Sequence, residues 1–228
     1  MKNKFYLFFT ICCYLMAFEG DKHDYYLPNG LKVIIYEKHA HPIVALNVIY
    51  DLGGHDDPIG KKGLTNVMQN LMWEGSNSYA KDEHSLIVSS TGGWSSNTYW
   101  WLDDYIELTN VSTSDNFELL LKLEADRMSA PLINNNSVKN AKEKALSKLK
   151  ELMESSMWAV TEAITSIYPD KHPYSYHWLG IKDDIETISV DDCQNTYDKY
   201  ITPNNAVLVI VGDVDPLNSF NLITKYFG

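Results

Sequence analysis

Alternating hydrophobic and polar positions along the first quarter of the chain predict β-strands. Residues 25–37 contain two β-rich runs separated by Asn29-Gly30, a dipeptide typical of a tight hairpin turn. In the segment 42–53 that follows, every second residue is apolar, so these side chains share one face: Val44, Leu46, Val48 and Tyr50. Two more strands are expected within 94–101 and 105–112, and a last apolar strand within 204–213.

Helical spacing of apolar residues fills most of the remaining chain. We expect helices over 61–75, 80–90, 113–130, 137–167, 189–200 and 215–227. The third should be capped by Thr113 or Ser114, and the fourth should break near Ser155-Ser156. Strands come mostly in pairs and helices follow in runs. This order favours an α+β fold, a mainly antiparallel β-sheet flanked by helices, over a doubly wound parallel sheet.

The helix expected over 61–75 combines an apolar face with three amides. Its apolar residues recur at steps of three and four: Leu64, Val67, Met68, Leu71 and Met72. Asn66, Gln69 and Asn70 lie among them. A buried amide requires hydrogen-bond partners, so three amides on one apolar helix need an explanation.

Composition and charge limit the function classes. The 228 residues are 45% hydrophobic, which is enough to fill a core. A net charge of -11 argues against a nucleic-acid binder, because such proteins need a basic surface. Cys193 is the only cysteine outside the first twenty residues, so no internal disulfide is expected there. Asp191 and Asp192 would raise the pKa of this thiol, which favours a packing role.

The N-terminus has the layout of a secretory signal. Lys2 and Lys4 precede an apolar run over 5–18, and charge returns at Glu19. We expect residues 1–19 to be a signal peptide and 22–228 to form the folded domain. The run is short for a transmembrane helix, so an uncleaved anchor is the alternative, as is a buried N-terminal element. The protein is expected to be exported, either periplasmic or extracellular, with membrane attachment through the N-terminus as the alternative.

The three amides have the spacing of a catalytic motif. The chain has no GxSxG elbow, no Walker loop and no CxxC pair. In the inverted zinc motif H-x-x-E-H, two imidazoles bind the metal and the glutamate takes a proton from zinc-bound water. Asn66, Gln69 and Asn70 stand at the positions of that histidine, glutamate and second histidine.

Nearly the whole chain after the signal resembles the N-terminal half of the pitrilysin/insulinase family of zinc metallopeptidases. The similar segments are 27–76, 90–100, 117–131 and 168–216. The resemblance implies the same α+β fold. It also implies that active members bind zinc through the two histidines and through a glutamate about 76 residues after the second.

This chain departs from the family pattern at every catalytic position. Asn66 and Asn70 replace the histidines, Gln69 replaces the general base, and Leu146 falls at the expected third ligand. An amide is a poor zinc ligand, glutamine cannot accept a proton at neutral pH, and leucine has no lone pair. We therefore expect neither zinc nor another cofactor, and no peptide hydrolysis by the chain alone.

The expected function is that of a non-catalytic partner or peptide-binding subunit. The partner would be a catalytic relative or a second-half chain of the family. An extended peptide would add to the strand expected at 94–101, where Asn97 matches a family asparagine. Trp94 and Thr98 are further candidate substrate-binding residues, and core packing is the alternative for Trp94.

Two other functions stay open at the level of sequence. One is an active zinc endopeptidase with displaced ligands, for which the candidates are His55, Glu74, His84 and Glu143. The other is a truncated relic of a two-domain peptidase, which would expose apolar surface where the missing half should pack.

Overall fold

The computed structural model describes residues 21–97 and 104–228. The expected signal peptide and Thr98 lie outside the described residues. Six strands form one sheet in the order β1-β2-β6-β3-β5-β4. Their bounds are β1 Lys22–Tyr26, β2 Lys32–Glu37, β3 Ile43–Tyr50, β4 Trp94–Asn97, β5 Ile106–Thr113 and β6 Ala206–Gly212. All neighbouring strands pair antiparallel except β2 and β6, which are parallel.

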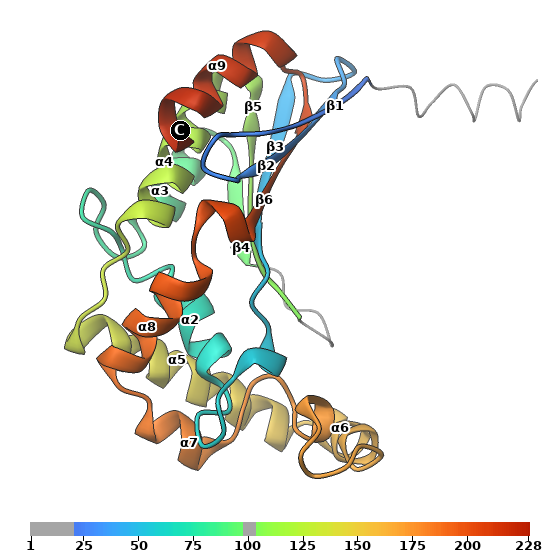
Figure 1. The fold of residues 1–228 in the computed structure, drawn as a ribbon, viewed down its shortest axis with the longest axis vertical. Coiled ribbons are helices and arrows are strands. Elements are labelled where there is room, and N and C mark those ends of the chain that lie inside the picture. Colours follow the sequence, from blue (N-terminus) through green and yellow to red (C-terminus); the bar gives the residue numbers. More distant parts are fainter. Residues whose placement is uncertain (1–20, 98–103) are drawn as a thin grey trace, which may run out of the picture.

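The described helices form two groups around the sheet. They are α2 Leu64–Leu71, α3 Glu83–Ser90, α4 Phe117–Ser129, α5 Asn135–Glu154, α6 Met157–Thr165, α7 Lys182–Thr187, α8 Val190–Tyr200 and α9 Pro216–Phe227. Figure 1 shows α3, α4 and α9 against one face of the sheet, while α2 and α5 to α8 form a second group below its end. The α+β prediction is therefore confirmed.

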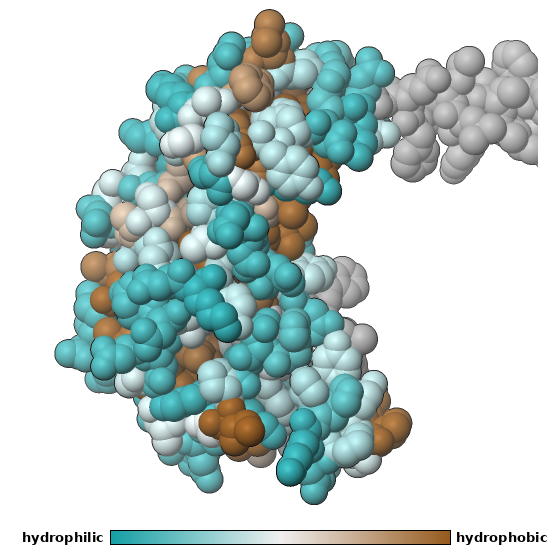
Figure 2. All heavy atoms as spheres, in the orientation of Figure 1, coloured by the Kyte–Doolittle hydropathy of each residue, from teal (hydrophilic) through white to brown (hydrophobic). Residues whose placement is uncertain are grey.

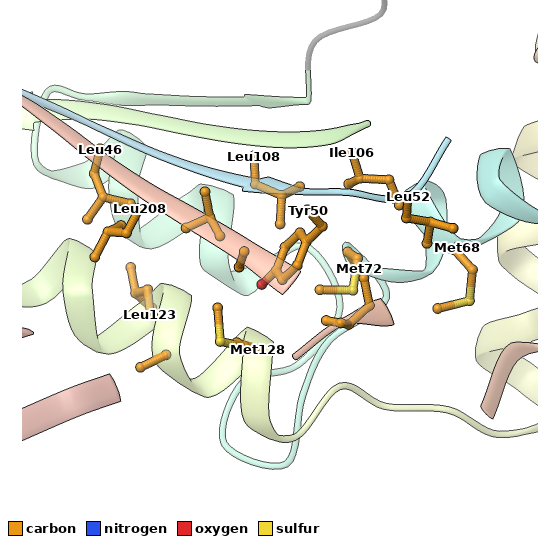
Figure 3. Close-up of a cluster of buried hydrophobic side chains, with 14 of the residues drawn as sticks. Leu46, Tyr50, Leu52, Met68, Met72, Ile106, Leu108, Leu123, Met128 and Leu208 are labelled. Atoms are coloured by element: carbon orange, nitrogen blue, oxygen red, sulfur yellow. The ribbon is translucent and has the colours of Figure 1, made fainter. Parts of the chain in front are cut away.

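Alternation along β3 sets the layer structure. Val44, Leu46, Val48 and Tyr50 are fully buried on the face that the helices cover. Figure 3 shows that this core continues from the sheet to α2, where Met68 and Met72 lie beyond Tyr50 and Leu52. The amide-bearing helix is thus part of the main hydrophobic core.

Several local predictions hold. The Asn29-Gly30 hairpin joins β1 to β2, with Gly30 at a φ of 92°. The long helix breaks where expected, with Ser155 and Ser156 between α5 and α6. The helix expected over 61–75 is shorter, because Gly63 at a φ of 103° sets its N-cap and the chain leaves the helix after Leu71.

Two local predictions are wrong. Neither Thr113 nor Ser114 caps α4, because the 3₁₀ turn η2 (Ser114–Asn116) intervenes and the helix starts at Phe117. The Ser114 hydroxyl instead donates to the carboxylate of Asp213. The short helix α7 lies in a segment for which no helix was expected. Within the described residues, no helix is long and apolar enough to cross a membrane.

Candidate functional site

A buried carboxylate fixes the start of α2. Asp57 follows the 3₁₀ turn η1 (Gly54–Asp56) and accepts hydrogen bonds from the backbone N–H groups of Gly63, at 2.6 Å, and Thr65, at 2.8 Å. The Thr65 hydroxyl also donates to it, at 2.8 Å. Burial raises the pKa of Asp57 to about 6, although these hydrogen bonds lower it in part. Asp57 thereby satisfies two of the N–H groups that a helix leaves free at its N-terminus.

The three amides of α2 are all buried. Asn66, Gln69 and Asn70 have exposed fractions of 0%, 3% and 7%. The Asn66 amide donates to the carbonyl of Leu179 at 3.0 Å, and its Oδ1 accepts from the Asn70 amide at 3.0 Å. The Asn70 amide also donates to the backbone carbonyl of Asn66 at 2.8 Å. Asn66 and Asn70 therefore form a hydrogen-bonded pair, and the bond from Asn66 to Leu179 ties α2 to the segment before α7.

Helix α5 packs against α2 and contains Leu146, the residue at the position where the family resemblance implies the third zinc ligand. Ala141 and Ala145 of α5 are fully buried. Leu146 is half-buried and lines a groove together with Ile188 and Val190. Glu143, the nearest carboxylate, is 64% exposed and lies 3.9 Å from Lys139.

These residues do not fit a zinc ion. Zinc sites in proteins use imidazole, thiolate or carboxylate, whereas the positions of interest present two asparagines and a leucine. Gln69, at the position of the base, cannot take a proton from water at neutral pH. Within 21–97 and 104–228, no group of three or more His, Cys, Asp or Glu side chains is arranged to hold a metal ion.

The carboxylate nearest the end of α2 is engaged by cations. Glu74 is 2% exposed, and its oxygens lie 2.8 Å from Lys144 and 3.1 Å from Lys81. Asn140 also donates to it, at 2.8 Å. Burial raises the pKa of Glu74, but the hydrogen bonds from Lys144, Asn140 and Lys81 outweigh burial and lower it overall. Glu74 thus has the surroundings of a structural ion pair.

His84 belongs to a buried network that the sequence did not reveal. Its Nδ1 lies 2.5 Å from Arg127, and its Nε2 lies 3.3 Å from Glu124. Burial, followed by the positive charge of Arg127, lowers the pKa of His84. Asn110 of β5 donates to Glu124 at 2.6 Å, and Ser95 of β4 donates to Asn110 at 2.7 Å. The network therefore connects α3 and α4 to the last strand of the sheet.

Strand β4 lies at the edge of the described sheet, where it pairs with β5. Trp94 is 52% exposed and lies opposite Val111, on the sheet face away from the helices. The backbone of Asn97 pairs with Leu108, but the Asn97 side chain lies outside the described part, as does Thr98. The expected peptide-binding strand is therefore an edge strand with an exposed aromatic residue.

Cys193 has the surroundings of a packing residue. It is fully buried, and burial together with Asp192 raises the pKa of its thiol to about 12. Such a thiol stays protonated and unreactive at neutral pH.

Comparisons with known proteins identify the relatives of this chain. The family model described as "Insulinase (Peptidase family M16)" matches residues 32–181, and the model "Peptidase M16 inactive domain" matches 187–228. The zinc protease PqqE of Helicobacter pylori is 24% identical over 211 residues, which are 88% of this chain and 45% of that protein. The A-factor-processing enzyme of Saccharomyces cerevisiae is 24% identical over 204 residues, 85% of this chain and 20% of that enzyme.

Solved structures show the same fold. A protease from Helicobacter pylori superposes with a TM-score of 0.84 at 21% identity, over 92% of this chain and 50% of that one. Pitrilysin superposes with a TM-score of 0.82 at 15% identity, over 92% of this chain and 23% of that one. The chain spans half or less of the length of each of these proteins. Because a single family model covers residues 32–181, this chain belongs to the insulinase (M16) family of peptidases.

Proposed function

We propose that this chain is a non-catalytic member of the M16 family that binds extended peptide or forms part of a family assembly. The observation that carries the proposal is the hydrogen-bonded pair Asn66–Asn70, together with Gln69, at the spacing of the H-x-x-E-H motif. The buried amides stabilise the helix through neutral hydrogen bonds. They supply neither the ligands nor the base that zinc-dependent hydrolysis requires.

The peptide would bind along β4. An edge strand offers unpaired backbone groups to which an extended peptide adds as a further strand. Trp94, 52% exposed at the start of β4, would add aromatic contact to such a peptide. The Ser95–Asn110–Glu124 hydrogen bonds hold β4 from its inner side, which reduces the entropy lost on binding.

A partner of the same family is favoured by the uncovered face of the sheet. Ile49 and Val207 are register partners on this face and are half-buried, and Val211 on the same face is 40% exposed. An apolar sheet face normally packs against another layer. We propose that a catalytic relative or a second-half chain covers it. We also propose that the chain is exported, as expected from residues 1–19, because its Escherichia coli relative PqqL is described as periplasmic.

Peptide binding and co-purification test this function. The purified chain should bind fluorescent extended peptides, which mass spectrometry should recover intact, and a chelator should leave the affinity unchanged. The chain should also co-purify with a zinc-bearing relative. Hydrolysis by the isolated chain that a chelator abolishes would instead establish a zinc peptidase with displaced ligands. Aggregation without peptide binding would establish a relic.

A further inference from the structure

A cavity in the second group of helices, which contains α2 and α5 to α8, has no role in the proposed function. It has a volume of about 220 Å³ and lies between η1, helix α6 and the segment 168–178. An apolar cavity of about 150 Å³ is enough to admit benzene, so this one can hold an aromatic ring with a short side group. We call it the aromatic cavity, because its lining includes Tyr168, Tyr174, Tyr176 and Trp178.

The residues that line the aromatic cavity contact one another through hydrogen bonds and ring contacts. The Tyr174 hydroxyl donates to the carboxylate of Asp104 at 2.6 Å, and the Tyr176 hydroxyl donates to the carbonyl of Gly54. The rings of Tyr168 and Tyr174 meet edge to face, with centroids 5.6 Å apart. A site held in this way is largely preformed, which is typical of small-molecule and side-chain pockets.

The charge at the aromatic cavity is negative. Asp104 lines it, and the imidazole of His55 bridges Asp104 and Asp56, at 3.3 Å from each carboxylate. None of the described lining residues is a lysine or arginine. The other histidine of the lining, His177, has its pKa lowered to about 4 by burial, so it is neutral at pH 7. The described lining therefore presents the carboxylate of Asp104 without a lysine or arginine beside it.

Aromatic rings beside a carboxylate favour one class of ligand. Rings attract cations through their faces, and the carboxylate adds a direct ion pair. The ring of Tyr176 already lies 4.4 Å from the ammonium of Lys62, which does not line the cavity. A carboxylate-bearing ligand would be repelled by Asp104, and a small hydrophilic cation would leave the apolar walls without contacts.

We propose that the aromatic cavity binds an aromatic group that carries a positive charge, such as an arylalkyl ammonium. The ring would fill the space between α6 and Trp178, and the ammonium would pair with Asp104. Two sources share this chemistry: a free aromatic amine, and the N-terminal aromatic residue of a peptide with its α-ammonium group. This inference does not depend on the proposed function.

Matched probes test the ligand class. In calorimetric or ligand-observed NMR titrations of the full chain, phenethylamine should bind more tightly than 2-phenylethanol, and 3-phenylpropionate should bind least. Asp104→Asn should reduce the preference for the amine over the alcohol by about two- to five-fold. A short peptide that begins with phenylalanine, compared with its acetylated form, distinguishes the two sources. Binding of the free-amine peptide assigns the site to peptide ends, and binding of phenethylamine alone assigns it to free amines.

A pair of lysine variants tests the location. Ile164 lines the aromatic cavity and is 43% exposed, whereas Ile167, which is 78% exposed, does not line it. Figure 2 shows hydrophobic surface at the lower right, over α6. Ile164→Lys should weaken phenethylamine binding by about ten-fold or more through like-charge repulsion, and Ile167→Lys should leave it unchanged. Circular dichroism verifies that both variants fold. Absence of binding by every probe, equal binding of the carboxylate, or unchanged binding in Ile164→Lys would overturn the proposal.

Discussion

The hydrogen bond between the Asn66 and Asn70 side chains allows a double-mutant cycle on the helix that defines the site. Asn66→Leu removes the donor to the Leu179 carbonyl and the acceptor for the Asn70 amide, bonds of 3.0 Å each at a position with no exposure. A buried polar group left unsatisfied costs about 1–3 kcal/mol, so two such groups should lower the free energy of unfolding by about 2–4 kcal/mol.

Asn70→Leu and the double variant measure how strongly the two amides are coupled. Asn70→Leu leaves mainly the Asn66 Oδ1 without its donor, and we expect a loss of about 1–2 kcal/mol. In the double variant both partners are apolar, so only the Leu179 carbonyl lacks a partner. The double variant should therefore be more stable than the sum of the two losses predicts, by about 2–3 kcal/mol.

Equilibrium urea unfolding followed by circular dichroism measures these losses, and transition midpoints analysed with one common slope limit the extrapolation error. Asn221→Leu, at an exposed position of α9, is the matched control and should change stability by less than about 0.5 kcal/mol. Losses that add to within about 0.3 kcal/mol would show that the two amides are not a coupled pair. That result would refute the structural role assigned to them.

Three further predictions concern ion pairing, pH and peptide binding. Glu74→Gln should lower the free energy of unfolding in urea by about 1–2 kcal/mol, a modest loss because Lys144 is 39% exposed. The loss should become smaller as the pH falls through the lowered pKa of Glu74, and an unchanged loss at low pH would contradict the ion pair. His177 has a folded-state pKa of about 4 against 6.5 unfolded, so protonation favours the unfolded state and stability should fall as pH drops between these values. The largest possible loss of stability is about 3 kcal/mol, and we expect about half of it because the ring is partly exposed. In His177→Phe the thermal midpoint should depend less on pH over this range, and an equal pH dependence in both proteins would refute the lowered pKa of His177. Trp94→Ala should weaken peptide binding about three- to ten-fold in fluorescence anisotropy, whereas Leu86→Ala, at another exposed apolar position, should not.

The elements that could be predicted from the sequence are those whose signals are local. The alternation of apolar residues identified the buried face of β3, because successive side chains of a strand point to opposite faces of the sheet. The buried residues are Val44, Leu46, Val48 and Tyr50. The sequence also indicated that Asn66 and Asn70 would need hydrogen-bond partners if buried, but it did not identify those partners, which the structure gives as the Leu179 carbonyl and the two amides themselves.

The features that sequence reasoning missed depend on contacts between distant segments. The network of His84, Asn110, Glu124 and Arg127 joins two helices and a strand, and no local spacing indicates it. The aromatic cavity likewise requires α6 and η1 to approach each other across about a hundred residues of sequence. Ser114 is a good N-cap residue by type, but its hydroxyl is taken by Asp213 of a remote turn.

The metal content of the purified chain tests the central claim most directly. The chain is purified in the presence of zinc, dialysed against buffer without chelator, and analysed by elemental mass spectrometry. A variant with Asn66→His, Gln69→Glu, Asn70→His and Leu146→Glu, treated in the same way, shows whether this scaffold can still hold the ion. We expect far less than one zinc ion per wild-type chain and the same unfolding midpoint with and without chelator. One tightly bound zinc ion per wild-type chain would contradict it.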